Sequence, residues 1–513
     1  MKSNKRGEVF LVGAGPGDPG LITVRAIEYL KQADVVYYDF LVNPELLAYA
    51  PAGSRKVYSG KQGGKLSAGH SVEQKKIISK IVHEAQRGRT VVRLKGGDPF
   101  LFGRGGEEGE ALARQGIPFE VVPGVSSALA VPAYAGIPMT HRDYASSVAF
   151  ITGHEKREQD GASRGLIPPF DWQTLAQIDT LCILMGVRNL ADIVASLLQV
   201  GKSPETPVAV IESGTLPIQR TIEGVLNDIV KKVEAAQVKP PAIMVVGPVV
   251  RLRPLLRWFE KRPLFGKRIL VTRTQEQAGE LSRLLRAAGA EVLEVPTIEI
   301  HPPRSYQGLD RALRHLADYQ WVIFTSQNAV QSFCQRLSRQ GKDLRCLAGV
   351  KVAAIGAATA ALLLDKGIKV DTVPAEFNAE GLSKIFQRRS ILGQRILIPR
   401  ARKGREVLLH ALRRAGAKVD LVEAYQTLMP RQGRKDLRRL LLQHPVDWVT
   451  FTSSATVENF YRMLGAKSLL RGVRIACIGP VTAQTVRKLG WKVSIMPKQS
   501  TIPQLVRAII KTK

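Results

Sequence analysis

The chain has 513 residues, which is too many for a single hydrophobic core, so two to four domains are expected. Its composition of 45% hydrophobic and 23% charged residues is typical of a soluble globular protein, and it has no apolar run of the roughly 18–20 residues that a membrane-spanning helix needs. Four scattered cysteines, none in a C-x-x-C pattern, argue against a disulfide framework and a structural zinc site, so we expect no metal and a reducing cytoplasm.

The net charge of +31 is distributed unevenly along the chain. Residues 264–513 carry 42 Lys and Arg against 18 Asp and Glu, an excess of 24, whereas residues 1–263 carry 33 against 26, an excess of 7. A basic half of this kind indicates an anionic partner: nucleic acid, an anionic membrane surface or a polyanionic small molecule. A basic solvated surface without a partner is the alternative.

The first element, VFLVGAGPGDPGLIT at 9–23, reads as a strand followed by a glycine-rich turn. It does not match the dinucleotide-binding fingerprint G-x-G-x-x-G, because Asp18 takes the place of the third glycine. Pro16 and Pro19 also remove two amide donors from a loop that would need them to bind a pyrophosphate. The turn must therefore serve another kind of ligand.

Further apolar strands follow, and they alternate with helical segments. EVFLVGAG, ADVVYYD, TVVRLKGG and FEVVPG read as strands, and SVEQKKIISKIVHEAQ reads as a helix. This alternation predicts an α/β domain with a largely parallel sheet. VVPGVSSALA is expected to lead into a second α/β lobe that contains SVAFITGH, DTLCILMG and TPVAVIESGT. The proline-bearing stretch RLRPLLRWFEKRPLFGKR at 251–268 separates the two charge regimes and is expected to form a short helix and linker.

The second half contains an internal duplication. RILVTR, AGAEV and FTSQNAVQSF each return 127 residues later as RILIPR, AGAKV and FTSSATVENF. IGAATA returns as IGPVTA with an offset of 123 residues. Four segments in nearly one register predict two similar lobes of doubly wound α/β type, in which ligands bind at the carboxyl ends of the strands.

Glycine-rich strand ends are the most informative chemical feature of the first half. VGAGPGDPG, GGDPFLFGRGGEE, VPGVSSA and YAGIPMTHRD all allow the backbone to approach a ligand closely. No Ser/His/Asp series and no metal-ligand cluster is evident. The reaction is therefore expected to depend on a bound reactive cofactor and on positioning.

Together with ADVVYYDFLV and TPVAVIESGTLPIQ, these motifs closely resemble uroporphyrinogen-III C-methyltransferase over about residues 7–260. The resemblance implies a two-lobed tetrapyrrole methylase fold with S-adenosylmethionine bound between the lobes. It implies a cofactor pocket formed by Pro16, Gly96, Gly97, Asp98, Leu101, Ser126, Ser127, Met185 and Gly214. It places Lys61, Arg104 and Arg142 on the side of the acidic substrate, where cations meet carboxylates. Asp39 and Glu107 are the candidate acid/base groups, with Lys61 beside them in the catalytic set.

The second half, 264–513, resembles uroporphyrinogen-III synthase in GKRILVTR, FTSQNAV, LVEAYQT and IACIGPVTA. The resemblance implies two interleaved lobes, with crossings near HPPRS at 301–305 and MPRQGR at 429–434, and hydroxymethylbilane, a linear polycarboxylate, as the substrate. Tyr425 is the catalytic candidate. Four hydroxyl residues on strand ends are expected to hold carboxylates: Ser326, Ser453, Ser454 and Thr482.

The sequence therefore predicts a bifunctional enzyme of sirohaem or cobalamin biosynthesis. Residues 1–250 would form the methyltransferase, with lobes of about 1–122 and 123–250, and 251–263 would form a linker. Residues 264–513 would form the synthase, with lobes of about 264–300 plus 430–513 and 301–429. We expect uroporphyrinogen III as the shared intermediate, a homodimer, no membrane partner and no nucleic acid. A methyltransferase joined to a basic nucleic-acid-binding or regulatory module is the alternative.

Overall fold

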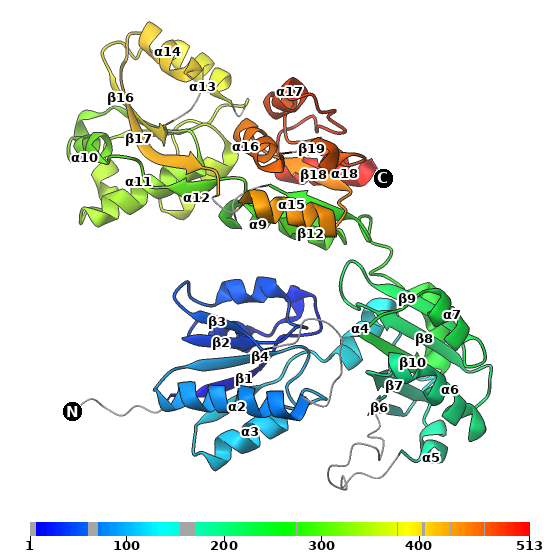
Figure 1. The fold of residues 1–513 in the computed structure, drawn as a ribbon. Coiled ribbons are helices and arrows are strands. Elements are labelled where there is room, and N and C mark those ends of the chain that lie inside the picture. The colour runs from blue at the N-terminus through cyan, green and yellow to red at the C-terminus, as the bar shows by residue number, and fades with distance from the viewer. Residues whose placement is uncertain are drawn as a thin grey trace. The chain divides into compact units, whose positions relative to one another are not determined.

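The computed structural model describes residues 7–59, 70–153, 170–272, 275–376, 378–402, 406–430, 433–465 and 467–512. The chain packs into two compact α/β units (Figure 1). The first contains the chain up to Arg268 together with Leu284–Glu291, and the second contains Ile269–Arg283 and Val292–Thr512. The expected mixed α/β fold is confirmed. Among the described residues no helix is both long and apolar enough to cross a bilayer.

The first lobe of unit 1 is a five-stranded parallel sheet in the order β3-β2-β4-β1-β5. Four of its strands are the ones expected from the sequence. The bounds of the strands are β1 Val9–Gly13, β2 Val35–Tyr38, β3 Arg55–Tyr58, β4 Val91–Lys95 and β5 Phe119–Val122.

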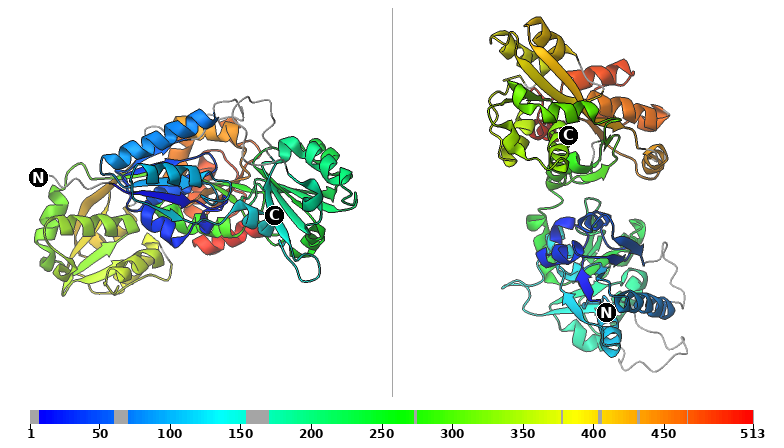
Figure 2. Two further views of the ribbon diagram at one scale, coloured as in Figure 1. Left: turned by 90° about the horizontal axis from the view of Figure 1, so that it is seen from below. Right: turned by 90° about the vertical axis from the view of Figure 1, so that its left-hand side faces the viewer.

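Helices cover both faces of this sheet, which explains why β1 is apolar and buried along its whole length. Leu11 packs with residues of α2 (His70–Gln86) and α3 (Gly105–Arg114), which lie side by side on one face (Figures 1 and 2). Val12 points to the opposite face and packs with Leu30 of α1 (Val24–Leu30).

The second lobe of unit 1 holds a mixed sheet in the order β6-β7-β10-β8-β9. Only β6 and β7 run parallel, and the other neighbours are antiparallel. The largely parallel sheet expected for the first half is therefore found in its first lobe, whereas the sheet of its second lobe is mainly antiparallel. The elements of this lobe are β6 Val148–Thr152, β7 Thr180–Leu184, β8 Pro207–Glu212, β9 Arg220–Val225, β10 Ala242–Val246, α4 Ser127–Ala135, α5 Trp172–Ala176, α6 Leu190–Gln199 and α7 Ile229–Ala235.

The segment after this lobe was expected to form a short helix and linker. It contains a short 3₁₀ helix, Pro248–Leu252, and the one-turn helix α8, Arg253–Leu256. Phe259 and Leu264, which follow α8, are each only 2% exposed. The stretch 251–263 is therefore anchored to protein at Arg253 and Phe259, whereas Leu255 is 78% exposed.

Unit 2 contains two sheets, of order β12-β11-β18-β19 and β13-β17-β16-β14-β15. Their strands are β11 Arg268–Val271, β12 Glu291–Glu294, β13 Glu299–His301, β14 Trp321–Phe324, β15 Lys351–Ala354, β16 Arg395–Ala401, β17 Lys418–Leu428, β18 Trp448–Phe451 and β19 Arg474–Cys477. The helices are α9 Gln275–Ala287, α10 Gln307–Arg314, α11 Gln327–Arg339, α12 Ala357–Asp365, α13 Ala379–Gln387, α14 Val407–Arg414, α15 Gly433–Gln443, α16 Ser454–Leu464, α17 Pro480–Lys488 and α18 Ile502–Lys511.

The duplicated segments occupy equivalent positions in the two sheets. Each sheet, however, combines one segment from the first copy of the repeat with one segment from the second copy. The first copy of RIL-x-x-R lies on β11 and pairs with β18, which carries the second copy of the FTS motif. The second copy of RIL-x-x-R lies on β16 and pairs with β14, which carries the first FTS. The expected interleaved fold is confirmed. The first crossing falls between β12 and β13, a few residues before HPPRS, because β13 already pairs with β17.

Asp310 of α10 is expected to make the stability of unit 2 sensitive to acid. The Arg336 guanidinium on α11 forms two hydrogen bonds with Asp310, both 2.6 Å long, and holds the pKa of this carboxyl below its usual value. The resulting stabilisation is complete above the pKa of about 3.9 in the unfolded chain and is lost as the pH falls through the lower folded pKa. Asp310→Asn should therefore reduce the free energy of unfolding at pH 7, and its difference from the parent chain should shrink toward pH 3. Denaturant unfolding of both proteins between pH 7 and pH 3 measures this difference in the free energy of unfolding. A difference that does not change with pH would show that the Asp310–Arg336 ion pair is not its cause.

Candidate active site

A cavity of about 900 Å³ lies in unit 1 and is lined by loops that follow strands of both of its sheets. Its volume falls in the range of about 300–1,000 Å³ that is typical of small-molecule sites. The lining is mainly backbone and apolar side chains with a few polar groups: Gly15, Pro16, Gly17, Phe40, Leu41, Val42, Asn43, Pro44, Gly96, Gly97, Ser127, Val131, Leu184, Met185, Val187, Arg188, Ile211, Ser213, Gly214, Leu216, Pro240, Pro241, Ala242 and Ile243.

Six of the nine residues predicted for the cofactor pocket line this cavity, and they come from five separate stretches of the chain. They are Pro16, Gly96, Gly97, Ser127, Met185 and Gly214.

The other three, Asp98, Leu101 and Ser126, are not among the residues that line the cavity. Asp98 Oδ1 accepts hydrogen bonds from the N–H groups of Phe100 and Leu101, and Asp98 Oδ2 accepts one from Gly124 N–H at 3.0 Å. Leu101 is partly buried against the apolar core of the second lobe. Ser126 is the N-cap of α4, and its hydroxyl accepts from Ala128 N–H. These three residues support the loops that form the cavity.

The glycines at the strand ends of the first half have no side chain, so the loops that carry them pack closely against one another and leave their backbone open to a ligand. A Cβ on Gly13 would lie 2.5 Å from the Gly124 backbone, and a Cβ on Gly124 would lie 2.3 Å from the Gly97 carbonyl oxygen. Gly15 and Gly97 also exchange two backbone hydrogen bonds, of 3.2 and 2.7 Å. The glycine-rich turn at the start of the chain is thus joined to the Gly96–Gly97 turn, and both then face the cavity.

Several lining residues were not predicted. Asn43 donates a hydrogen bond to the Gly17 carbonyl at 2.9 Å, and Phe40 and Leu41 follow directly after Asp39. Arg188 lines the cavity three residues after Met185. These residues follow the buried strands β2 and β7, and that position was the available sequence signal. They were missed because the search for the pocket relied on glycines at strand ends, and these positions carry other residues.

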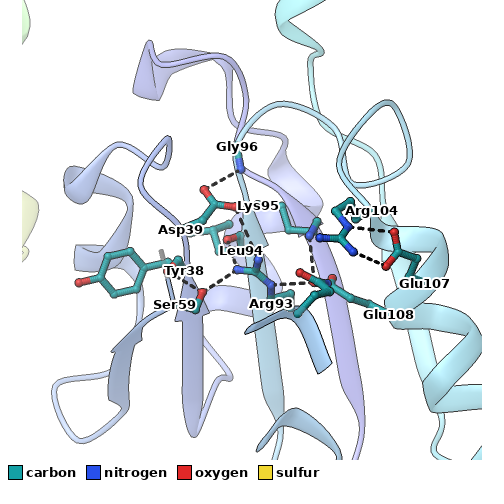
Figure 3. A network of polar contacts seen from close by, with 11 residues as sticks. Tyr38, Asp39, Ser59, Arg93, Leu94, Lys95, Gly96, Arg104, Glu107 and Glu108 are labelled. Atoms are coloured by element: carbon teal, nitrogen blue, oxygen red, sulfur yellow. Dashed lines mark hydrogen bonds and ion pairs between the residues drawn. The ribbon is translucent and has the colours of Figure 1, made fainter. Parts of the chain in front are cut away.

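Asp39 lies beside the cavity in a charged cluster (Figure 3). Its Oδ1 accepts from the N–H groups of Leu41 and Gly96, both at 3.3 Å, and both of these residues line the cavity. Its Oδ2 lies 3.7 Å from the Arg93 guanidinium. The carboxylate is thus held at the ends of β2 and β4 by two cavity-lining amides and one buried cation.

Glu108 forms the buried centre of the same cluster. It is 1% exposed, and its Oε1 accepts from Lys95 Nζ at 3.0 Å, Gln74 Nε2 at 2.8 Å and Arg93 Nε at 3.2 Å. Burial, followed by the nearby Arg93 charge, lowers the pKa of Lys95. Glu108 is therefore the buried anion that pairs with the two buried cations Arg93 and Lys95, and the sequence reasoning did not single it out.

The remaining predicted residues of the first half lie elsewhere. Arg104 and Glu107 form a two-point ion pair with each other, at 2.9 and 2.7 Å, on the far side of Lys95 from Asp39 in Figure 3. Arg142 is exposed. None of these three lines the cavity described above. Lys61 falls outside the described residues.

In unit 2 the structure brings Tyr425 and Ser326 together. Their hydroxyl groups lie 2.9 Å apart, and the Ser326 oxygen also caps α11 by accepting from Ala329 N–H. Tyr425 is 7% exposed on β17, and burial raises its pKa. The phenol therefore stays protonated at neutral pH and is able to donate a hydrogen bond.

The other predicted hydroxyls belong to the opposite lobe. Ser453 caps α16, as Ser326 caps α11 in the duplicated segment. Ser454 accepts a hydrogen bond from Thr485 at 2.9 Å, and Thr482 lies 4% exposed on the same helix as Thr485. These three residues are near two neighbouring helix N-termini, and much of their hydrogen-bonding capacity is used within the lobe.

Two family models match the chain, one in each half. Residues 8–230 match the tetrapyrrole (corrin/porphyrin) methylases, and residues 279–507 match uroporphyrinogen-III synthase. A uroporphyrinogen-III C-methyltransferase of Priestia megaterium is 49% identical over 245 residues, which are 48% of this chain and 98% of that protein. The solved structure of uroporphyrin-III C-methyl transferase from Thermus thermophilus, complexed with S-adenosylhomocysteine, is 40% identical and covers 48% of this chain and 94% of its own, with a TM-score of 0.40.

One relative extends over nearly the whole chain. The porphyrin biosynthesis protein HemD of Ruminiclostridium josui is 37% identical over 509 residues, which are 99% of this chain and 98% of that protein. Its match spans both halves in a single alignment. The chain therefore belongs to the family of porphyrin biosynthesis proteins in which a tetrapyrrole methylase is joined to a uroporphyrinogen-III synthase.

Proposed function

We propose that this protein cyclises hydroxymethylbilane to uroporphyrinogen III in its second half and methylates that product twice, to precorrin-2, in its first half. The observation that carries the proposal is the cavity of unit 1, because six residues assigned from the methyltransferase motifs line it together. The family membership of both halves supports the pairing of activities. The product of the first reaction is the substrate of the second, which gives the fusion a chemical reason.

The cavity fits S-adenosylmethionine, which supplies a methyl group activated on a sulfonium. The Gly96–Gly97 turn leaves room for a ligand: Gly97 has a φ of +69°, and the nearest atom that its Cβ would meet is 3.7 Å away. Ser127, Ser213 and Asn43 supply polar groups among apolar walls. This combination suits a ligand with one nucleoside and one amino-acid end.

In the methylation the chain has two tasks, to align the tetrapyrrole and to accept a proton. Arg104 and Arg142 are assigned to the substrate carboxylates. Asp39 is assigned to accept the proton that the tetrapyrrole releases elsewhere in the ring system after the methyl group is added, because its carboxylate accepts hydrogen bonds from the N–H groups of Leu41 and Gly96, which line the cavity. Glu107 is the weaker candidate, because it is paired with Arg104 outside the cavity lining.

In the synthase half Tyr425 is assigned to assist loss of the substrate hydroxyl group, with Ser326 orienting the phenol. The excess of 24 positive charges in residues 264–513 suits a polycarboxylate substrate. The alternative of a basic nucleic-acid-binding module is not favoured, because residues 279–507 match the synthase family.

The decisive experiment supplies the purified chain with hydroxymethylbilane and S-adenosylmethionine, and identifies the products by mass and by isomer type. Dimethylated type III product is expected. Unmethylated type III product would overturn the methyltransferase assignment, and the type I ring alone, which forms without an enzyme, would overturn the synthase assignment.

Replacing Gly96 by Ala tests the cavity wall. The new methyl carbon would lie 2.6 Å from Leu41 Cβ, so the segment that carries Asp39 and Leu41 must move. We expect the dissociation constant for S-adenosylhomocysteine to rise by about tenfold or more, as measured by calorimetry. Gly106→Ala is the matched control, because a Cβ there meets nothing within 4 Å. Equal affinities of the two variants would contradict the assigned wall.

We also propose a homodimer, as the methyltransferase resemblance suggests, and a cytoplasmic location, as the four scattered cysteines suggest. Sedimentation velocity on the full chain tests this assembly, and a concentration-independent monomer would contradict it.

A further inference from the structure

The segment that follows the methylase fold packs onto α4, the helix that begins at the cavity-lining Ser127. Gly136, at the end of α4, has a φ of +77°, and a Cβ there would lie 2.5 Å from backbone atoms of Leu256 and Arg257. The indole N–H of Trp258 donates to the Ala133 carbonyl at 3.1 Å. The backbone after α8 is thus seated closely on the end of a cavity helix.

Tyr134 of α4 connects this segment to the glycine-rich turn. Its ring lies 5.0 Å from that of Trp258 and 4.7 Å from that of Phe259, measured between centroids. Its hydroxyl donates to Asp18 Oδ2 at 2.9 Å, and burial raises its pKa, so this proton is retained. Asp18 directly follows Pro16 and Gly17, which line the cavity.

Glu260 makes a second connection. Its Oε1 accepts from Gln219 Nε2 at 2.9 Å and from Thr221 Oγ1 at 2.8 Å. Its Oε2 accepts from Arg253 at 2.7 Å, and Arg253 is 3% exposed. A carboxylate from the joining segment is therefore bonded to the start of β9 and to the loop before it.

The chain of hydrogen bonds continues to the cavity. Gln219 Oε1 accepts from Thr215 N–H at 2.9 Å, and Thr215 Oγ1 accepts from Asp18 N–H at 3.1 Å. Ser213 and Thr215 have φ values of +50° and +68°, an arrangement that costs free energy unless its surroundings hold it. Ser213 lines the cavity, and so does Leu216 on the other side of Thr215.

We propose that Trp258 and Glu260 are positioning residues for the cofactor cavity. They hold α4, the turn at residues 15–18 and the loop at residues 213–219 in the arrangement that binds S-adenosylmethionine. The segment between the two halves therefore completes the methyltransferase site in addition to joining it to the synthase. This inference rests on the proposed function of the cavity.

Calorimetry of the full chain with S-adenosylhomocysteine tests the proposal. Glu260→Ala and Trp258→Ala should each raise the dissociation constant by about tenfold, because the released loops must be ordered when the ligand binds. Glu260→Gln keeps an oxygen for Gln219 and Thr221 and should recover part of the affinity. Leu255→Ala is the matched control from the same segment, since Leu255 is 78% exposed, and it should bind as the parent chain does.

Stoichiometry separates positioning from simple loss of folded protein. A smaller folded fraction lowers the stoichiometry and leaves the dissociation constant unchanged, whereas a displaced loop raises the dissociation constant of folded molecules. Parent-like dissociation constants in both alanine variants would overturn the positioning role, even if stoichiometry fell. A parent chain that binds no ligand would instead overturn the proposed function of the cavity. The rate of uroporphyrinogen III formation should stay at the parent level in every variant.

Discussion

Replacing Asp39 by Asn is expected to lower the rate constant of methylation by about 10²- to 10⁴-fold, the usual contribution of a positioned acid/base group. The amide oxygen of Asn still accepts from Leu41 and Gly96, so the loop keeps its place while the proton acceptor is lost. The dissociation constant for S-adenosylhomocysteine should change by only a few fold. Turnover of S-adenosylmethionine with uroporphyrinogen III under saturating conditions measures the effect.

Glu107→Gln is the matched control for this prediction, because Glu107 is the other candidate and lies outside the cavity lining. Its effect on the rate constant should be less than about tenfold. A larger loss in Glu107→Gln than in Asp39→Asn would transfer the proton-accepting role to Glu107. An equal, small loss in both would mean that solvent or substrate takes the proton.

Replacing Glu108 by Ala is expected to lower the free energy of unfolding of unit 1 by about 3–5 kcal/mol. Arg93 and Lys95 are 4% and 3% exposed, and Glu108 is the buried anion that contacts both of them. Removing it leaves two neighbouring cations in a poorly solvated site. Denaturant unfolding of the full chain, with hydrogen exchange of β4 and α3 to identify the unit that opens, measures the loss.

The adjacent residue again provides the control. Glu107 is about half exposed and pairs with Arg104 on the surface, so Glu107→Ala should cost less than about 1 kcal/mol. Equal losses of unfolding free energy in Glu108→Ala and Glu107→Ala would show that the ion pairs of Glu108 with Arg93 and Lys95 do not stabilise the lobe.

The two neighbouring glutamates illustrate a limit of sequence reasoning. The motif GRGGEE drew attention to Glu107, whereas the structure places Glu108 at the centre of the charged cluster. On α3 the buried positions are Gly105, Glu108, Gly109 and Leu112, and only the last is a large apolar residue. No hydrophobic stripe therefore marked the inward face of this helix, and the burial of Glu108 could not be predicted.

The joining segment illustrates a second limit. The sequence predicted a short helix and linker there, and the short helix is confirmed. Its packing depends on Gly136 and Tyr134, which lie more than a hundred residues earlier in the chain. Only the folded structure shows that the backbone of Leu256 and Arg257 packs against Gly136, where a side chain would not fit. Only the folded structure shows that the Tyr134 hydroxyl donates a hydrogen bond to Asp18.

The sequence by itself determined the α/β class, four of the five strands of the parallel sheet, the duplication in the second half and, through its resemblance to the methyltransferase family, six residues of the cavity wall. The class, the strands and the duplication follow from local patterns, because apolar runs and repeated segments can be recognised without their partners in space, whereas the cavity residues follow from motifs matched to the family. The tertiary structure alone decided which glycines face each other, which glutamate is buried and how residues after α8 contact the elements that carry the cavity lining. Those depend on contacts between segments far apart in the chain, and burial and charge compensation exist only once such segments meet.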